Sequence, residues 1–359
     1  MSDIPVHGTV EPGFEQVRGV FESILENKEV GAGLSAYIDG RHVVDLWGGW
    51  ADAAKTREWQ RDTIACTYST VKGMTATCAH KLVDQGLLDV DEPVATYWPE
   101  FAQAGKEKIT VRMLLGHQSG LPYAKGSYPE EKRFDWETMT DALARSTPHW
   151  EPGTKSEYHG GSFGYLVGEV LRRIDGRPLS TFFREEIAEP LGADYLIAFG
   201  PEDDDRCAEM VGPPDDVGPT DTREWRAAGD GAATAFGTAD GLARVYAALA
   251  RGGELDGVQL LQPETIEAAV QEQIPLNGVS DDMFPVGLGY MLLWKMFPAL
   301  EYTKMFGHHG MGGSFGFADP VNRVGFGYVM NRLHGGGVFD AQPAVYRCIA
   351  AHRDAGGSR

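Results

Sequence analysis

The sequence predicts an α+β fold, in which an antiparallel β-sheet is assembled from both ends of the chain around a long, mostly helical insertion. Two observations lead to this prediction. Strand-like segments, rich in β-branched and aromatic residues, gather near the N-terminus and again near the C-terminus. The stretch between them carries apolar residues at helical spacing, without the strand–helix alternation of a doubly wound parallel sheet.

The N-terminal part of the fold is expected to contain a helix and then a hairpin. Apolar residues recur at helical spacing from Phe14 to Leu25, shortly after Pro12, which suits a helix start. The segment LSAYIDGRHVVDLWGGW then has the pattern of two strands joined at Asp39 and Gly40, a dipeptide that favours a tight hairpin. The first strands of the sheet are therefore placed here.

The C-terminal part is expected to supply the remaining strands. Strand-like composition covers residues 286–294, 314–319 and 324–331. The last two segments are separated by a turn-length connection, which implies an antiparallel pair. A closing helix is expected at about residues 341–352.

Helices are expected through the middle of the chain, each ended by glycine. The expected helical segments are VKGMTATCAHKLVDQG ending at Gly86, VRMLLGHQSGLP ending at Gly120 and Pro122, SFGYLVGEVLRRIDG ending at Gly176, and GTADGLARVYAALARGG ending at Gly252 and Gly253. We expect residues 1–68 and 225–359 to form the sheet domain and residues 69–224 a mostly helical domain. The active site is expected between the two domains.

Composition and charge exclude several classes of function. The 359 residues carry 32 basic and 52 acidic side chains, a net charge of −20, which repels phosphate backbones and anionic lipid headgroups. No apolar run is long enough to span a bilayer, and the start has no basic and apolar regions of a secretory signal. We therefore expect a cytoplasmic protein with no nucleic-acid or membrane partner.

Cysteines and histidines give no metal-binding pattern. With no C-x-x-C pair and no export signal, the cysteines are expected to be free and mostly buried thiols; they are Cys66, Cys78, Cys207 and Cys348. The ten histidines include no H-E-x-x-H or other zinc spacing. We therefore expect no metal and no cofactor.

The pentapeptide GGSFG occurs twice, around Ser162 and around Ser314, and each copy matches the G-x-S-x-G nucleophile elbow. An elbow requires a buried strand before the serine and a helix after it. Ser314 is followed by a strand and a hairpin, and Ser162 is preceded by the polar stretch EPGTKSEYHG. We therefore interpret both glycine clusters as tight backbone passages rather than nucleophile sites.

A better nucleophile candidate is Ser69 in TYSTVKG. Ser69 and Lys72 form S-x-x-K, and no other serine in the chain has a lysine three residues later. The motif opens a predicted helix, whose N–H groups and partial positive charge favour an oxyanion, and the spacing places Lys72 on the same face. An unprotonated amine there can take the serine proton. An ordinary surface lysine on a helix remains an equally good interpretation of this position.

Two further elements, Tyr158 in EPGTKSEYHG and His308–His309–Gly310 just before a predicted strand, stand after S-x-x-K along the chain. Together, and in this order, the three elements resemble the serine β-lactamase and penicillin-recognising superfamily. The closest resemblance is to class C β-lactamases and family VIII carboxylesterases, and it covers most of the chain. IDGRHVVDLWGGWAD resembles the family's first hairpin, LLGHQSGLP its helix-ending signature and GGSFGFADPVNRVGFGYVMNR its last strands. The resemblance implies a β-lactamase-like fold.

The resemblance also implies roles for the site residues. Ser69 matches the acyl-accepting nucleophile, Lys72 its proton partner and Tyr158 the catalytic tyrosine that begins Y-x-N. The K-T-G element is matched by three substrate-binding residues, His308, His309 and Gly310. The backbone N–H groups of Ser69 and Met311 would form the oxyanion hole.

Two departures from the β-lactamase pattern favour uncharged esters as substrates. Gly160 stands where Y-x-N has its asparagine, so an amide donor is missing. His308 stands where K-T-G has its lysine, and a histidine is only partly charged at neutral pH. The expected function is a serine carboxylesterase acting on short-chain esters, with a small-molecule ester as its partner and no prediction of oligomeric state. The alternatives are a β-lactamase or D-aminopeptidase, an acyltransferase, and a binding module that has kept the fold.

Overall fold

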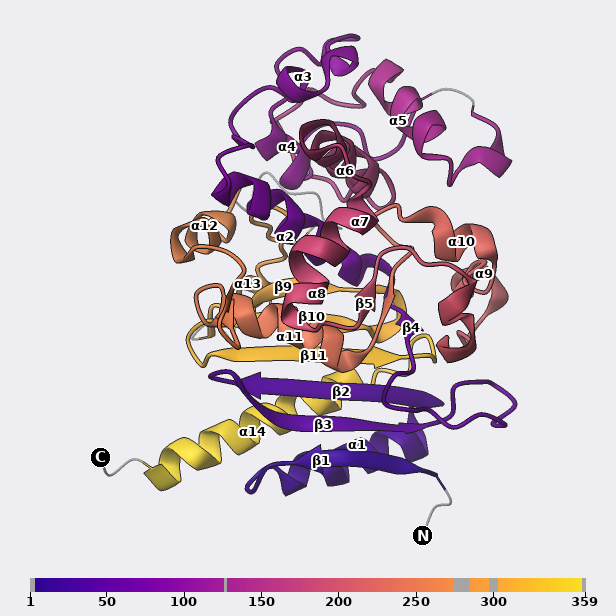
Figure 1. Ribbon diagram of the computed structural model, residues 1–359, viewed down its shortest axis with the longest axis vertical. Coiled ribbons are helices and arrows are strands. Elements are labelled where there is room, and N and C mark those ends of the chain that lie inside the picture. Colours follow the sequence, from indigo (N-terminus) through magenta and orange to yellow (C-terminus); the bar gives the residue numbers. More distant parts are fainter. Residues whose placement is uncertain (1–3, 126–127, 274–283, 297–302, 357–359) are drawn as a thin grey trace.

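The computed structural model describes residues 4–125, 128–273, 284–296 and 303–356. Its centre is an antiparallel sheet whose six described strands follow the order β1-β3-β2-β11-β10-β9 (Figure 1). The N-terminal strands are β1 (Val6–Val10), β2 (Gly31–Ile38) and β3 (Arg41–Gly49), and the C-terminal strands are β9 (Phe306–His309), β10 (Phe315–Asp319) and β11 (Val324–Met330). The predicted α+β fold, with a sheet built from both chain ends, is confirmed.

The middle of the sheet is formed by β2 and β11, which pair along their whole length and are almost entirely buried. Small residues on β11 allow the alanine-rich helix α11 (Ala239–Ala250) to lie very close to it. A Cβ added at Gly325 would come within 2.3 Å of the Ala247 nitrogen, and one at Gly327 within 2.2 Å of the Ala239 oxygen. The glycines of VGFGYVM therefore determine how tightly this helix packs on the sheet.

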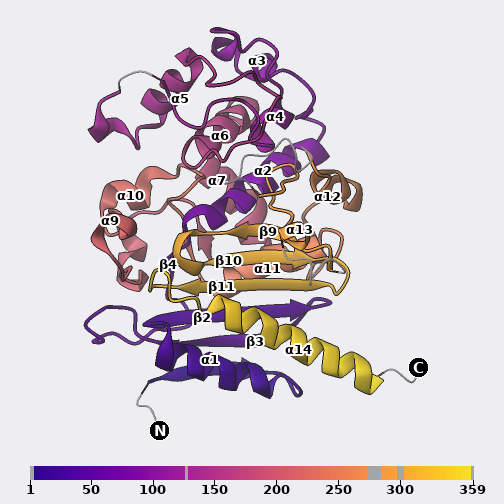
Figure 2. The same ribbon diagram turned by 180° about the vertical axis from the view of Figure 1, so that it is seen from behind.

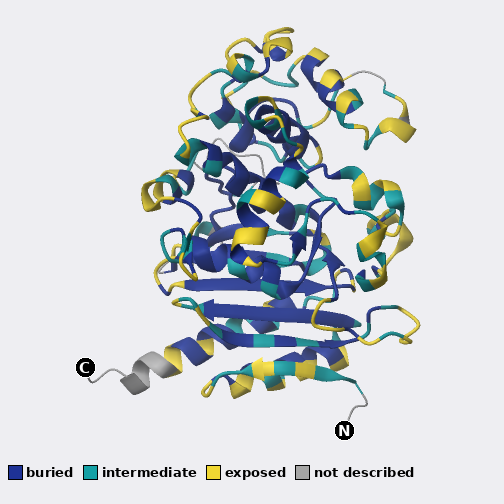
Figure 3. Ribbon diagram, viewed as in Figure 1, coloured by how far each residue is buried: buried dark blue, intermediate teal, exposed yellow. Residues whose placement is uncertain are grey.

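The other face of the sheet is covered by α1 (Glu15–Asn27) and α14 (Val338–Gly356), which lie beside each other in Figure 2. Both were expected from the sequence, α14 with a shorter range. Helix α1 buries one apolar stripe, at Val17, Phe21, Ile24 and Leu25. The sheet is thus enclosed by helices on both faces, and buried residues follow its strands in Figure 3.

Most of the helical part lies beyond the β9 edge of the sheet, with α2 between them (Figure 1). Its helices are α2 (Val71–Asp84), α3 (Val94–Tyr97), α4 (Val111–Leu115), α5 (Trp136–Arg145), α6 (Ser162–Asp175), α7 (Leu179–Phe183), α8 (Glu189–Leu191), α9 (Pro214–Val217) and α10 (Arg223–Ala228). The later segments α12 (Pro263–Ala269) and α13 (Leu293–Met296) flank the same edge. Two glycines in the left-handed region end the predicted helices, Gly86 after α2 and Gly176 after α6.

A small second sheet joins segments that are far apart in the chain. Its order is β4 (Ala65–Cys66), β6 (Phe236–Gly237) and β5 (Tyr195–Leu196). These strands come from both sides of the expected domain boundaries, so hydrogen bonds cross between the two predicted domains. The boundaries at residues 68 and 224 remain a prediction.

Two predicted elements differ from the structure. Residues 286–294 were expected to form a strand, but residues 286–292 fold into a compact turn against α2, with only isolated bridges at Val286 and Met291, and residues 293–294 begin α13. The reason is Gly289, whose φ of +85° reverses the chain, and whose missing Cβ would lie 2.5 Å from Cβ of Ala76. The Tyr290 hydroxyl then bonds to that of Thr77 on α2, at 2.8 Å.

The second difference concerns the helix expected to run to Gly120. Helix α4 ends at Leu115, because Gly116 caps it and His117 adopts a φ of +58°, which is incompatible with a right-handed helix.

A further strand, β1, was not predicted, since VHGTV has little apolar content and forms an edge. His308, His309 and Gly310 precede β10 as expected, and the two histidines lie on β9, a short strand that was not predicted.

The cysteine prediction is confirmed, because all four thiols are free and buried. Within the described ranges, no group of three or more His, Cys, Asp or Glu side chains is placed to hold a metal ion. In the same part of the chain, no helix has the length and apolar character needed to cross a bilayer.

Candidate active site

Ser69 and Lys72 are brought together at the start of α2. Ser69 lies in a 3-10 turn, Tyr68–Thr70, that leads directly into this helix. The Lys72 ammonium nitrogen, Nζ, is 3.1 Å from Ser69 Oγ and 2.7 Å from the carbonyl oxygen of Ala232. The Lys72 side chain has no exposed surface, whereas Ser69 is half-buried. Lys72 is therefore not the surface lysine that the sequence left open.

Tyr158 reaches the same place from the segment that precedes α6. Lys72 Nζ lies over its ring, 4.8 Å from the ring centre, in a cation–π contact. Among the described residues, the structure records no hydrogen bond from the Tyr158 hydroxyl to Ser69 or Lys72. Lys72 thus contacts both other side chains: it is hydrogen-bonded to Ser69 and lies over the Tyr158 ring.

His308 lies on β9 with its ring 6.2 Å from that of Tyr158, measured between centroids. Its Nδ1 is 2.7 Å from the His309 carbonyl oxygen, which only accepts hydrogen bonds, so Nδ1 carries the proton. The other nitrogen, Nε2, then has a lone pair, and this buried atom has no partner among the described residues.

Burial, and next the positive charge of Lys72, lower the pKa of His308 well below its ordinary value. The expectation of a partly charged histidine is therefore corrected, because His308 is neutral at neutral pH. His309 is half-buried, its pKa is also lowered by burial, and its ring meets Phe284 edge-on at 5.1 Å.

The turn after β9 is tied to the turn that carries Ser69. Gly310 N–H donates to the Ser314 carbonyl at 2.8 Å, and Ser314 Oγ donates to the Thr67 carbonyl at 2.7 Å. A Cβ on Gly310 would lie 2.0 Å from that Thr67 oxygen, so only glycine fits there. These bonds keep Met311, the next residue, in a fixed relation to Ser69.

The two GGSFG serines are both engaged by backbone carbonyls. Ser162 Oγ donates to the carbonyls of Leu121 and Pro122, at 2.6 and 2.9 Å. Ser314 Oγ donates to Thr67, as described above, and is 3.0 Å from Thr70 Oγ1. Both serines are buried, and neither of these bonds involves a basic side chain. This geometry agrees with their interpretation as structural residues.

Comparison with known proteins places the chain in a family. A model of the family described as Beta-lactamase matches residues 17–351. The chain belongs to the β-lactamase family. It is 36% identical to Esterase/beta-lactamase LipL of Mycobacterium tuberculosis (strain ATCC 25618 / H37Rv), over 91% of this chain and 83% of LipL.

Solved structures agree with the family assignment. A family VIII carboxylesterase superimposes with a TM-score of 0.90 and 38% identity, covering 96% of this chain and 100% of the other. A penicillin-binding protein homologue from Caulobacter crescentus gives a TM-score of 0.88 and 36% identity, with coverage of 96% and 100%. These relatives identify this β-lactamase-family chain as a serine hydrolase with a β-lactamase-like fold.

Sequence reasoning missed the loop that holds Lys72 in this β-lactamase-family protein. The carboxylate oxygen Oδ1 of Asp230 accepts hydrogen bonds from the N–H groups of Ala232 and Ala233, both at 2.8 Å, which fixes the Ala232 carbonyl. A Cβ on Gly164 would lie 1.8 Å from the Asp230 carbonyl oxygen, so α6 touches this loop directly. The Asp230-Gly231 dipeptide is a turn signal that indicates a loop, but not its partner.

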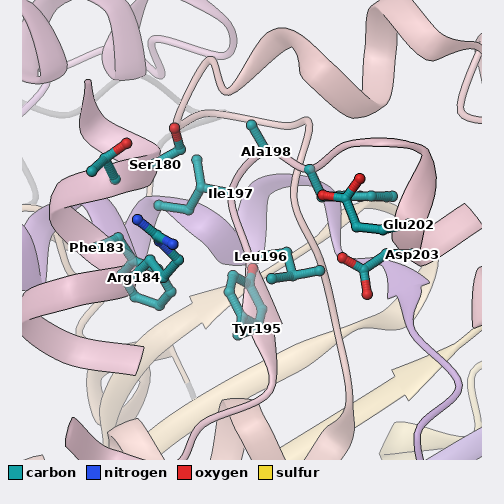
Figure 4. Close-up of a pocket in the computed structure, with 11 residues that line it drawn as sticks. Ser180, Phe183, Arg184, Tyr195, Leu196, Ile197, Ala198, Glu202 and Asp203 are labelled. Atoms are coloured by element: carbon teal, nitrogen blue, oxygen red, sulfur yellow. The ribbon is translucent and has the colours of Figure 1, made fainter. Parts of the chain in front are cut away.

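A surface pocket of about 260 Å³ lies elsewhere on this β-lactamase-family protein, between α7, β5 and the turn Pro201–Arg206 (Figure 4). Figure 4 shows Arg184 on one side of the pocket and Glu202 and Asp203 on the other. Arg184 already pairs with Glu185 at 2.8 Å, and Asp203 pairs with Arg206 at 2.7 Å. No residue of the Ser69 group lines this pocket, so we do not assign it to the substrate.

Proposed function

We propose that this chain is a serine carboxylesterase that hydrolyses short-chain carboxylic esters through an acyl-enzyme on Ser69. The observation that carries the proposal is the hydrogen bond from fully buried Lys72 to half-exposed Ser69. A nucleophile beside a basic side chain is the arrangement that acyl transfer requires. The two GGSFG serines, Ser162 and Ser314, instead donate to backbone carbonyls. None of these bonds, in the part of the chain that the structure describes, involves a basic side chain.

In the proposed mechanism, the Lys72 ammonium first releases one proton to water. The resulting amine donates one N–H to the Ala232 carbonyl and accepts the Ser69 proton on its lone pair. Ser69 Oγ attacks the ester carbonyl carbon, and the N–H groups of Ser69 and Met311 stabilise the oxyanion. The bond to the alcohol oxygen breaks, and the alcohol takes a proton delivered through Lys72 and Tyr158. Water then attacks the acyl carbon and gives its proton to the same pair. The bond between the acyl carbon and Ser69 Oγ breaks, and Ser69 Oγ takes the proton back as the acid leaves.

The preference for uncharged esters is supported by two positions. Gly160 has no side-chain amide to donate, and an added Cβ there would have only the Tyr158 ring within 4 Å, at 3.9 Å. His308 is neutral and directs a lone pair, not a cation, into its surroundings. A substrate carboxylate would lose a charge-assisted hydrogen bond of about 1.5 to 3 kcal/mol there.

Two alternatives use the same acyl-enzyme. The name of LipL joins esterase and β-lactamase, which favours β-lactam hydrolysis as the second candidate. A D-aminopeptidase would release an amine in the same step. An acyltransferase would replace water by an alcohol in the second step. A cytoplasmic location and a small-molecule ester as partner remain predictions, which fractionation and substrate screening would test.

The experiment is to treat the protein with a fluorophosphonate and to measure its intact mass. We expect one adduct in the unaltered protein and in Ser162→Ala and Ser314→Ala, and none in Ser69→Ala. An adduct on Ser162 or Ser314 would refute the assignment of the nucleophile. Hydrolysis rates for nitrophenyl acetate and for a cephalosporin, with and without added alcohol, then separate the alternatives. Comparable kcat/KM for the two substrates would contradict the ester preference.

A further inference from the structure

We infer that two buried histidines, His117 and His159, are positioning residues that hold Tyr158 beside Lys72. Neither histidine is placed to react with substrate; they act through Tyr158. The inference rests on the proposed function, because it takes Tyr158 to be part of the proton-transfer group. It also gives a role to the LLGHQSGLP segment, which the proposed mechanism does not use.

The backbone on both sides of Tyr158 is bonded to His117. Glu157 N–H donates to the His117 carbonyl oxygen at 3.1 Å. His159 N–H donates to the Nδ1 atom of the His117 ring, also at 3.1 Å. Since Nδ1 accepts this bond, it carries no proton, and His117 holds Tyr158 only in its neutral form.

His159 closes the loop from the other direction. Its Nδ1 donates to the Glu157 carbonyl oxygen at 2.6 Å. Its Nε2 accepts from the Leu121 N–H at 3.2 Å and lies 2.9 Å from Ser119 Oγ. The ring therefore bridges residues 157 and 121, and its hydrogen bonds likewise require the neutral tautomer.

The His117 ring also packs directly on Tyr158. The two ring centroids are 5.3 Å apart, and the His117 ring also stacks on Phe163 of α6, at 4.9 Å. The Tyr158 ring thus contacts both the His117 ring and the Lys72 ammonium, which lies 4.8 Å from the Tyr158 ring centre. His117, whose φ of +58° accompanies the end of α4 at Leu115, thus contacts the segment around Tyr158 through both its backbone and its ring.

The charge state of the site keeps both histidines neutral. Burial lowers the pKa of His117 well below its ordinary value and that of His159 to about 4. The titratable groups around them add to this effect: His159, Lys72 and His308 lower the pKa of His117. Lys72 and His149 lower the pKa of His159, and Glu157 raises it. The hydrogen bonds that hold Tyr158 therefore persist across the neutral range.

The test compares two substitutions at residue 117 that both suit a positive φ. His117→Asn places a carbonyl oxygen near the Nδ1 position and tolerates the left-handed backbone. His117→Gly tolerates the backbone but loses both the acceptor and the ring. We expect His117→Gly to lower kcat for nitrophenyl acetate about tenfold to hundredfold with little change in KM, because a small displacement of a catalytic group has effects of this size. His117→Asn should recover a large part of the loss.

A double-mutant cycle with Tyr158→Phe separates positioning from a general structural effect. If His117 acts through Tyr158, the double variant His117→Gly/Tyr158→Phe loses no more kcat than Tyr158→Phe alone. Losses that multiply would overturn the inference. So would a normal kcat in His117→Gly when Tyr158→Phe is impaired, and in that case the proposed function would stand.

A normal kcat in Tyr158→Phe is a different failure, because it contradicts the proposed mechanism and removes the basis of the inference. Thermal unfolding of each variant monitors folding. If His117→Gly does not fold, the cycle is run with His159→Asn. That variant keeps a donor for the Glu157 carbonyl and lacks the acceptor for the Leu121 N–H. The same non-additivity supports the inference, and multiplied losses overturn it.

Discussion

The two GGSFG pentapeptides have the same five residues and different structures. The first, residues 160–164, leads into α6, with Ser162 as the first residue of the helix. The second, residues 312–316, passes through two glycines of positive φ and enters β10. The local sequence is identical, so the difference comes from what each copy meets in the folded chain.

Their last glycines show this difference most clearly. A Cβ on Gly164 would collide with backbone, 1.8 Å from the Asp230 oxygen, whereas one on Gly316 would meet the Tyr246 and Leu242 side chains at 2.4 and 2.8 Å. The first copy therefore supports the loop that accepts from Lys72. The second ties the Met311 turn to Ser69. The G-x-S-x-G motif contains the nucleophile in other folds. Here its two copies instead support the loop that binds Lys72 and the turn that carries Met311.

The largest effect is expected for Gly164→Ala, matched with Gly161→Ala in the same pentapeptide. Position 164 has no room against rigid backbone, so the variant should lose more than about 4 kcal/mol of unfolding free energy or fail to fold. Position 161 has no atom within 4 Å of an added Cβ, so its variant should stay within about 0.5 kcal/mol. Thermal unfolding measures both. Similar melting temperatures for the two variants would contradict this account of the first copy.

A smaller effect, and on rate rather than stability, is expected for Ser314→Ala. Losing the bond to the Thr67 carbonyl loosens the Met311 turn, so kcat should fall about tenfold to hundredfold, as for a displaced oxyanion donor. Ser162→Ala is the control, because it should cost stability of about 1 to 2 kcal/mol while leaving kcat nearly unchanged. Steady-state kinetics and thermal unfolding distinguish them. Equal losses of kcat would show that the two copies do not differ in this way.

The smallest effect is expected at the first glycines. Gly312 has a φ of +84°, and an added Cβ would lie 2.3 Å from the end of the Leu333 side chain. Gly312→Ala should therefore lose about 1 to 2 kcal/mol of unfolding free energy, mainly through backbone strain. Gly160 has no positive φ and only the Tyr158 ring nearby, so Gly160→Ala should be close to neutral. Chemical denaturation resolves this difference. A strongly destabilised Gly160→Ala would show that position 160 is constrained by something other than local space.

The sequence predicts the parts of the site that depend on short spacing or on motif order. Ser69 and Lys72 lie one helical turn apart, so their contact follows from the helix itself. The Ala232 carbonyl that fixes Lys72 lies 160 residues away and carries no side-chain signal. The neutral state of His308 depends on burial and on the nearby Lys72, which a sequence does not show.

The fold is predicted to a similar extent. Strands and helices with clear periodicity, such as β2, β11, α1 and α6, are found where they were expected. Residues 286–294 have a strand-like composition, but Gly289 and contacts with α2 fold most of them into a turn. The early end of α4 depends on His117, whose left-handed backbone is supported by hydrogen bonds to a segment 40 residues later. Tertiary contacts override local propensity in both places.

The pairing of β2 with β11 has a consequence for how the chain is made. Gly31 and Asn331, 300 residues apart, are joined by a hydrogen bond of 2.9 Å where these strands meet. In the growing polypeptide, β2 can pair with β3 on one side, but its other edge stays open until almost the whole chain has been synthesised. Contacts of such long sequence separation form slowly, and exposed edges recruit other chains. The nascent protein is thus vulnerable to aggregation for most of its synthesis, and the last strands close that edge.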